Sequence, residues 1–91
     1  MTHAVATVVL PRSLIALFPG AERRCVVVGT TVAEVIAGLD ALVPGMADRL
    51  LSAGPAIREH LNVFVDGERA GLATTVRPDA VVHVIPAVSG G

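Results

Sequence analysis

The stretch from Thr31 to Leu42, TVAEVIAGLDAL, marks the point where the chain changes from strand-like to helical periodicity. The hydroxyl of Thr31 can accept a hydrogen bond from the backbone N–H three residues on, and Glu34 can reach back, which is the capping box of a helix start. Apolar residues then recur at helical spacing and form one stripe, which consists of Val32, Val35, Ile36, Leu39 and Leu42. The pattern predicts one main helix that packs this stripe against a sheet and ends at Pro44-Gly45.

Two β-rich segments precede the helix. Residues 4–10 are dense in Val and Thr, and they stop at Pro11, which has no N–H to donate to a sheet ladder. Residues 23–28 follow the turn Phe18-Pro19-Gly20 and end at Gly29. This spacing predicts a hairpin at the start of the chain.

Shorter elements follow the helix. Residues 46–51 could add one helical turn, and residues 52–55 are expected to form an irregular connection. Residues 62–66 are predicted to be a strand that enters the turn Asp66-Gly67, after which residues 68–70 return as an edge strand.

The last predicted strand comprises residues 81–87. It follows the turn Arg77-Pro78-Asp79-Ala80, in which proline suits the second position. Strands around one well-marked helix predict an α+β domain, in which a mixed sheet of four to five strands packs on the main helix. We expect residues 1–86 to form this domain and residues 87–91 to form a flexible, projecting diglycine tail.

Side chains alternate between the two faces of a strand, so polar residues indicate which face is outward. The predicted inward set is Val63, Val65, Val82 and Val84. The predicted outward set, with Phe64 as an exposed aromatic, is Asn62, Phe64, Asp66, Val81, His83 and Ile85. If the last strand lies next to the strand of Phe64, an outer patch forms beside the root of the tail, and such patches commonly bind partners.

Composition excludes several classes of function. The chain has 91 residues, of which 53% are hydrophobic, and a net charge of −1, so it has no basic stripe for nucleic acid. Its single cysteine cannot form an internal disulfide, and the first residues do not resemble a signal peptide. No apolar run approaches the ~20 residues of a membrane helix. We expect a folded domain in the cytoplasm that binds neither nucleic acid nor membrane.

The sequence ends in Gly90-Gly91. With 9 glycines in 91 residues, chance would place Gly at both positions roughly 1% of the time. Two glycines give the narrowest backbone that a chain can offer, one able to enter a partner's channel where a side chain would clash. From Pro86 to Gly91 an extended chain spans ~17 Å, so the Gly91 carboxylate could reach a buried site while the domain stays outside.

The order of elements and the diglycine end resemble the ubiquitin-like β-grasp fold. More narrowly, the chain is similar to the bacterial sulfur-carrier family that includes the thiamine sulfur carrier and the small subunit of molybdopterin synthase (the ThiS/MoaD type). The residues that carry the resemblance are the end of the chain, residues 82–91, with residues 62–66 and the capped helix at Thr31. The segment Ile85-Pro86-Ala87-Val88-Ser89-Gly90-Gly91 looks most like the carrier of a cysteine-synthesis pathway. In place of the Gly-Asp pair that often precedes the last strand in this family, the chain has Arg77-Pro78-Asp79.

The resemblance implies that the chain is a carrier and not an enzyme. A partner, an E1-like adenylyltransferase that uses ATP and magnesium, would adenylate Gly91, and a sulfur donor would then leave a thiocarboxylate. Gly90 would give access to the carbonyl. A second partner would accept the sulfur: a cysteine synthase-like enzyme, the large subunit of molybdopterin synthase, or a thiazole synthase. Candidate partner-binding residues are Phe64, His83, Ile85, Val88 and Ser89, although these could also be ordinary exposed residues.

The chain itself shows no nucleotide-binding motif. It has no phosphate-cradling Gly-x-x-x-x-Gly-Lys-Ser/Thr motif, and all of its basic residues besides histidine are arginine. We therefore expect no cofactor in the chain itself.

Other candidate residues favour structural roles. Cys25 lies in a Val-rich strand without a nearby histidine, and His3, His60 and His83 lack the spacing of metal ligands. Two further functions stay open: a ubiquitin-like modifier that is joined through Gly91 to lysines of target proteins, and a binding module in which the glycines are only a flexible end.

Overall fold

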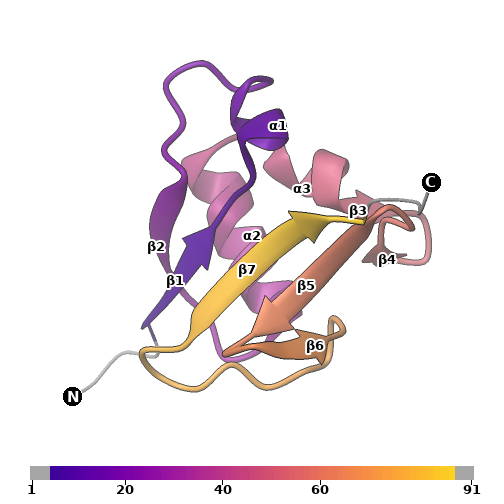
Figure 1. Ribbon diagram of the computed structural model, residues 1–91. Coiled ribbons are helices and arrows are strands. Elements are labelled where there is room, and N and C mark those ends of the chain that lie inside the picture. Colours follow the sequence, from indigo (N-terminus) through magenta and orange to yellow (C-terminus); the bar gives the residue numbers. More distant parts are fainter. Residues whose placement is uncertain (1–4, 88–91) are drawn as a thin grey trace.

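The computed structural model describes residues 5–87. A five-stranded mixed sheet dominates it, with the strand order β2-β1-β7-β5-β6. The strands are β1 (Val5–Val9), β2 (Arg24–Val28), β5 (Leu61–Val65), β6 (Glu68–Ala70) and β7 (Val81–Pro86). β1 pairs antiparallel with β2 and parallel with β7, and β7 pairs antiparallel with β5. The predicted hairpin, mixed sheet and last strand are therefore confirmed (Figure 1).

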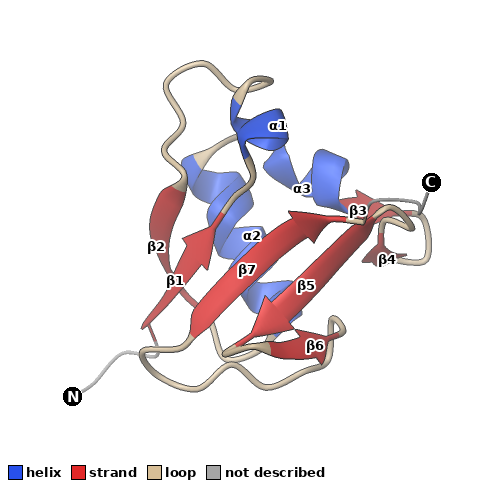
Figure 2. Cartoon of the chain, viewed as in Figure 1, coloured by secondary structure: helices blue, strands red, loops and turns tan. Residues whose placement is uncertain are grey.

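The main helix, α2 (Val32–Leu42), lies across one face of this sheet (Figure 2). The Thr31 hydroxyl accepts a hydrogen bond from the Glu34 N–H at 3.2 Å, as predicted. The Glu34 carboxylate reaches back one residue further than a capping box requires, because it accepts from both the N–H (2.8 Å) and the hydroxyl (2.9 Å) of Thr30. These hydrogen bonds lower the pKa of Glu34 below its ordinary value.

The apolar stripe of α2 differs from the prediction at its end. Leu42 is 59% exposed, whereas the other four members of the stripe are buried. Val43, the residue that caps the helix, packs against the core instead. A helical face advances by about 3.6 residues per turn, so the stripe that contains Leu39 continues to Val43 rather than to Leu42.

The segment after α2 is more regular than the sequence pattern indicates. It forms α3 (Met46–Leu50) and then a small antiparallel hairpin of β3 (Leu51–Ser52) and β4 (Ala56–Ile57). Of the expected irregular connection at residues 52–55, residues 53–55 form the turn of this hairpin and Ser52 belongs to β3. The Asp40 carboxylate accepts hydrogen bonds from the N–H groups of Gly45 and Ala47, at 3.1 and 2.9 Å, and so fixes the start of α3.

One short helix, α1 (Arg12–Ile15), was not predicted. It starts directly after Pro11 and buries Leu14 against the core. The core lies between the sheet and the helices, and it is built from aliphatic side chains: Ala6, Val8, Leu10, Leu14, Val27, Val32, Val35, Ile36, Leu39, Met46, Leu50, Val63, Val76, Ala80, Val82 and Val84.

Both predicted tight turns are confirmed. Asp66 and Gly67 have φ values of 49° and 87°, the left-handed conformation that a two-residue hairpin turn requires. In the other turn, the Ala80 N–H donates to the Arg77 carbonyl at 3.1 Å, and Asp79 has a φ of 66°. Pro78 therefore occupies the second position of the turn that leads into β7.

No helix in the described part of the chain is long and apolar enough to span a membrane.

Candidate functional site

The root of the tail lies at the centre of the sheet. β7, drawn in yellow in Figure 1, is flanked by β1 on one side and β5 on the other, and it ends at Pro86. The next residue, Ala87, donates its N–H to the carbonyl oxygen of His60 at 2.8 Å. The chain thus leaves the domain from a strand that is paired on both sides, and a hydrogen bond joins its next residue to the segment that enters β5.

Four of the predicted site residues, Val88, Ser89, Gly90 and Gly91, lie outside the described residues. The other three, Phe64, His83 and Ile85, are brought together on the outer face of the sheet. Phe64 lies directly opposite His83, and the residue opposite Ile85 is Asn62. We call the surface of Phe64, His83, Ile85 and Asn62 the outer patch. It occupies the two strands that end or begin next to the root of the tail.

Burial within the outer patch is uneven. Ile85 is 44% exposed, but Phe64 is half-buried. The prediction that Phe64 is an exposed aromatic is therefore wrong, because its side chain is less exposed than expected. Phe64 stands on an interior strand, with His83 opposite on β7 and Arg69 opposite on β6, and neighbours on both sides limit its exposure. Val82 and Val84, predicted to point inward, are buried. The alternation of faces is therefore confirmed for β7.

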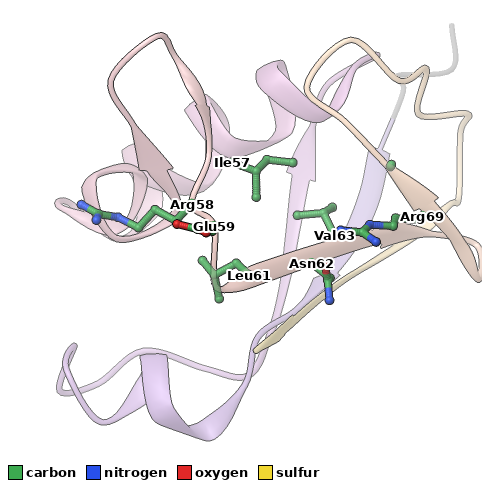
Figure 3. Close-up of a pocket in the computed structure, with 8 residues that line it drawn as sticks. Ile57, Arg58, Glu59, Leu61, Asn62, Val63 and Arg69 are labelled. Carbon is green, nitrogen blue, oxygen red and sulfur yellow. The ribbon is translucent and has the colours of Figure 1, made fainter. Parts of the chain in front are cut away.

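Two hollows flank the segment that leads into β5. The smaller, of ≈ 180 Å³, lies beside Ile57, Leu61, Val63 and Ala70; in Figure 3 the guanidinium groups of Arg58 and Arg69 are well separated and do not converge on it. Arg58 is instead turned to the carbonyl oxygen of Asp48, to which its Nε and Nη2 donate at 3.1 and 2.7 Å. This volume is below the ~300–1,000 Å³ of typical small-molecule sites.

The larger hollow, of ≈ 420 Å³, lies at the root of the tail. Its lining includes Pro86, His60 and Leu61, together with Leu14 and Ser13 of α1. A protein that received the tail would therefore meet an uneven surface beside Pro86 as well as the outer patch.

Cys25 has the environment of a structural cysteine. It is half-buried, and its Sγ donates to the Glu22 carbonyl at 3.4 Å. Burial, and to a lesser extent the negative charge of Glu22, raises the pKa of the thiol. Because the thiolate is the nucleophilic form, these surroundings disfavour a catalytic role.

Histidines do not form a metal site in the described structure. His60 is exposed before β5, His83 lies in the middle of β7, and His3 falls outside the described residues. Between residues 5 and 87, no three or more His, Cys, Asp or Glu side chains gather in a group that could hold a metal ion.

The bond from Ala87 to His60 is the feature of the site that the sequence did not reveal. The sequence pattern indicates only that His60 lacks the spacing of a metal ligand, whereas the structure places it in the turn before β5. The acceptor is a backbone carbonyl, which every residue carries, so no side-chain pattern could have indicated it.

Comparison with known proteins identifies relatives of the whole chain. The sulfur carrier protein CysO of Mycobacterium tuberculosis is 28% identical over 97 residues, covering 100% of this chain and 98% of the relative. The small archaeal modifier protein 3 of Haloferax volcanii is 35% identical over 65 residues, which cover 67% of this chain and 70% of that protein.

Solved structures of two CysO proteins are similar to this chain over most of its length. A chain in the crystal structure of the Amycolatopsis orientalis BexX/CysO complex has a TM-score of 0.84 at 29% identity, covering 94% of this chain and 99% of that one. The crystal structure of M. tuberculosis CysO has a TM-score of 0.82 at 30% identity, with coverage of 91% and 99%. The fold is thus the β-grasp of ubiquitin-like sulfur carriers, as the sequence predicted.

The model of the ThiS family matches residues 16–91, from the residue after α1 to the second glycine of the tail. This match includes the main helix, the outer patch and the root of the tail. The chain therefore belongs to the ThiS family of small sulfur carriers.

Proposed function

We propose that this protein carries sulfur as a thiocarboxylate on Gly91. A partner enzyme of the E1-like type would activate the Gly91 carboxylate with ATP and magnesium, and a second enzyme would accept the sulfur. The observation that supports this most strongly is the placement of the root of the tail: Pro86, followed by Ala87, ends the central strand β7, next to the outer patch, in a chain whose family match runs through Gly91.

The chemistry needs an external activator because a carboxylate is a poor acyl donor. In the first step, a Gly91 carboxylate oxygen attacks the α-phosphate of ATP, an acyl–phosphate bond forms, and pyrophosphate leaves. In the second step, hydrosulfide or an equivalent donor attacks the Gly91 carbonyl, the bond to AMP breaks, and a thiocarboxylate remains. Glycine at positions 90 and 91 keeps the carbonyl open to attack, whereas a β-branched side chain would obstruct it.

The folded domain would serve as the recognition element. Ile85 and Phe64 offer apolar contact area next to the root of the tail, and His83 and Asn62 offer polar contacts in the same patch. Interfaces are commonly dominated by a few such central residues. The partner would bind this surface and guide the tail, with Val88 and Ser89, into its active site.

The acceptor of the sulfur is proposed to be a cysteine synthase-like enzyme. The similarity to CysO extends over the whole chain and supports this choice over a molybdopterin synthase large subunit or a thiazole synthase. One neighbouring CysO structure contains a second protein, BexX, which supports the expectation that carriers of this kind work in complexes.

A second candidate function is protein modification. The relative from H. volcanii is named a small archaeal modifier protein, and the same activated Gly91 could acylate a lysine of a target. This chain has no lysine, so it could be attached to a target but could not be extended through its own side chains.

The test is ATP–pyrophosphate exchange by an E1-like adenylyltransferase purified from the same cells, with the full chain as substrate. We expect exchange with the native chain and none when Gly90 and Gly91 are deleted. Equal exchange without the two glycines would overturn the proposal. Adducts that persist in denaturant and reductant and require Gly91 would favour the modifier.

A further inference from the structure

The two edges of the sheet are built differently. β6, at one edge, has three residues, and its exposed members Glu68 and Arg69 are charged. β2, at the other edge, has five residues, and Val26 and Val28 are 63% and 61% exposed. Proteins usually protect sheet edges with short strands or charges, because an open edge pairs with other chains. β6 has this protection, and most of β2 does not.

The backbone of β2 has hydrogen-bonding groups that point away from the sheet. The Leu10 N–H donates to the Arg23 carbonyl at 2.7 Å, which identifies that pair as hydrogen-bonded. In an antiparallel ladder such pairs alternate with non-bonded ones. The register from Val9–Arg24 to Val5–Val28 then directs the N–H and C=O groups of Arg24 and Val26, and the N–H of Val28, toward the open edge, while the Val28 carbonyl oxygen lies beside Gly38 of α2.

The strand is also regular and suited to pairing. The register with β1 is continuous over all five residues, so no bulge turns the edge away. The sequence Arg24-Cys-Val-Val-Val28 contains no proline, and β-branched side chains fit well beside a neighbouring strand. Val27 is buried, so Val26 and Val28 share the outer face.

We propose that β2 pairs antiparallel with β2 of a second copy of this chain, so that the two sheets join into one. The register that pairs all five residues places Val26 of one copy opposite Val26 of the other, and Arg24 opposite Val28. Arg24, Val26 and Val28 then meet their counterparts, which allows about four backbone hydrogen bonds without the Val28 carbonyl. A shift by one residue would place exposed valines against inward-facing side chains.

Charge is compatible with this pairing. In this register the two Arg24 side chains stand four residues apart along the strands, at roughly 13 Å, so they do not face each other. The charged side chains of β6 oppose pairing at the far edge. The contact uses the same surface on both copies and closes at a dimer.

The dimer contact is separate from the proposed sulfur-carrier site. β1 lies between β2 and β7, so the outer patch and the root of the tail stay accessible when β2 is paired (Figure 2). The inference goes beyond the proposed function, and neither depends on the other.

Sedimentation of the full chain up to about 1 mM, where even a millimolar Kd populates dimer, tests the inference together with backbone hydrogen exchange. We expect the mass to approach that of a dimer with rising concentration. The amides of Val26 and Val28 should exchange more slowly in the dimer, because they become hydrogen-bonded.

The variant Val26→Lys should remain monomeric, since two ammonium groups would face each other at the centre of the contact. Leu42→Lys, which places the same charge on an exposed leucine of α2, should dimerise like the native chain. Three results would overturn the inference: a native chain that stays monomeric, a dimer in which the β2 amides are unprotected, or a Val26→Lys variant that is folded and still dimerises.

Discussion

Ala87 is joined to His60 by a hydrogen bond of 2.8 Å from its N–H to the His60 carbonyl oxygen. Directly before it, Pro86 lies opposite Leu61 in the pairing of β7 with β5. The direction in which the tail leaves the domain is therefore set by two successive contacts with the start of β5. In the function that we propose, that direction would determine how the tail meets a partner bound to the outer patch.

Replacing Ala87 by proline tests the importance of this contact. Proline has no N–H, so the hydrogen bond to His60 is lost, at a cost in unfolding free energy of about 0.5–1.5 kcal/mol. We expect kcat/KM for adenylation to fall, with a folded domain. Ala87→Ser keeps the N–H and is the control. Equal kcat/KM values for the two variants would show that the contact does not orient the tail.

The outer patch is tested by Ile85→Asp. A charge in the centre of an apolar contact is unfavourable, and we expect kcat/KM for adenylation to fall by about tenfold or more. Leu42→Asp is the matched control, because Leu42 is similarly exposed but lies on α2. If both variants lose activity equally, or neither does, the partner does not bind the outer patch.

The same leucine provides a test of the packing of α2. Leu39 is 1% exposed and Leu42 is 59% exposed. Leu39→Ala should lower the unfolding free energy by about 2–5 kcal/mol, whereas Leu42→Ala should change it by no more than about 0.5 kcal/mol. Chemical denaturation measures both. A large loss for Leu42→Ala would mean that the stripe continues as the sequence alone predicted.

The cap of α2 predicts a pH dependence. The pKa of Glu34 is lowered in the folded state, so the stability it contributes is present above its unfolded pKa and is lost as pH falls through its folded pKa. Glu34→Gln should therefore lower Tm at neutral pH, and this difference should begin to shrink as pH falls below the unfolded pKa of about 4.3 and vanish only below the lower, folded pKa. A constant difference across this range would show that the charge on Glu34 does not act through the cap.

Local patterns predicted much of this fold. Thr31 and Glu34 mark the start of α2, and Asp66-Gly67 and Pro78 mark turns, because each of these residues acts through its own conformation or a hydrogen bond to nearby backbone. The alternation of β7 also gave the buried pair Val82 and Val84.

What the sequence did not reveal depends on contacts distant in the chain. The partial burial of Phe64 comes from neighbours on β6 and β7, and the start of α3 is fixed by Asp40 of α2. The four-residue helix α1 is too short to show periodicity and is held by burial of Leu14. The two glycines at the end of the sequence indicate the tail, but the hydrogen bond that holds Ala87 to His60 joins backbone groups distant in the chain.

The central claim, that Gly91 carries sulfur, is tested most directly by the intact mass of the protein isolated from its native cells under sulfur demand. The account predicts a fraction of chains in which one oxygen of Gly91 is replaced by one sulfur, and fragmentation should locate that change at the last residue. A population that carries only the free carboxylate at Gly91, from cells in which the activating partner is present and active, would contradict it.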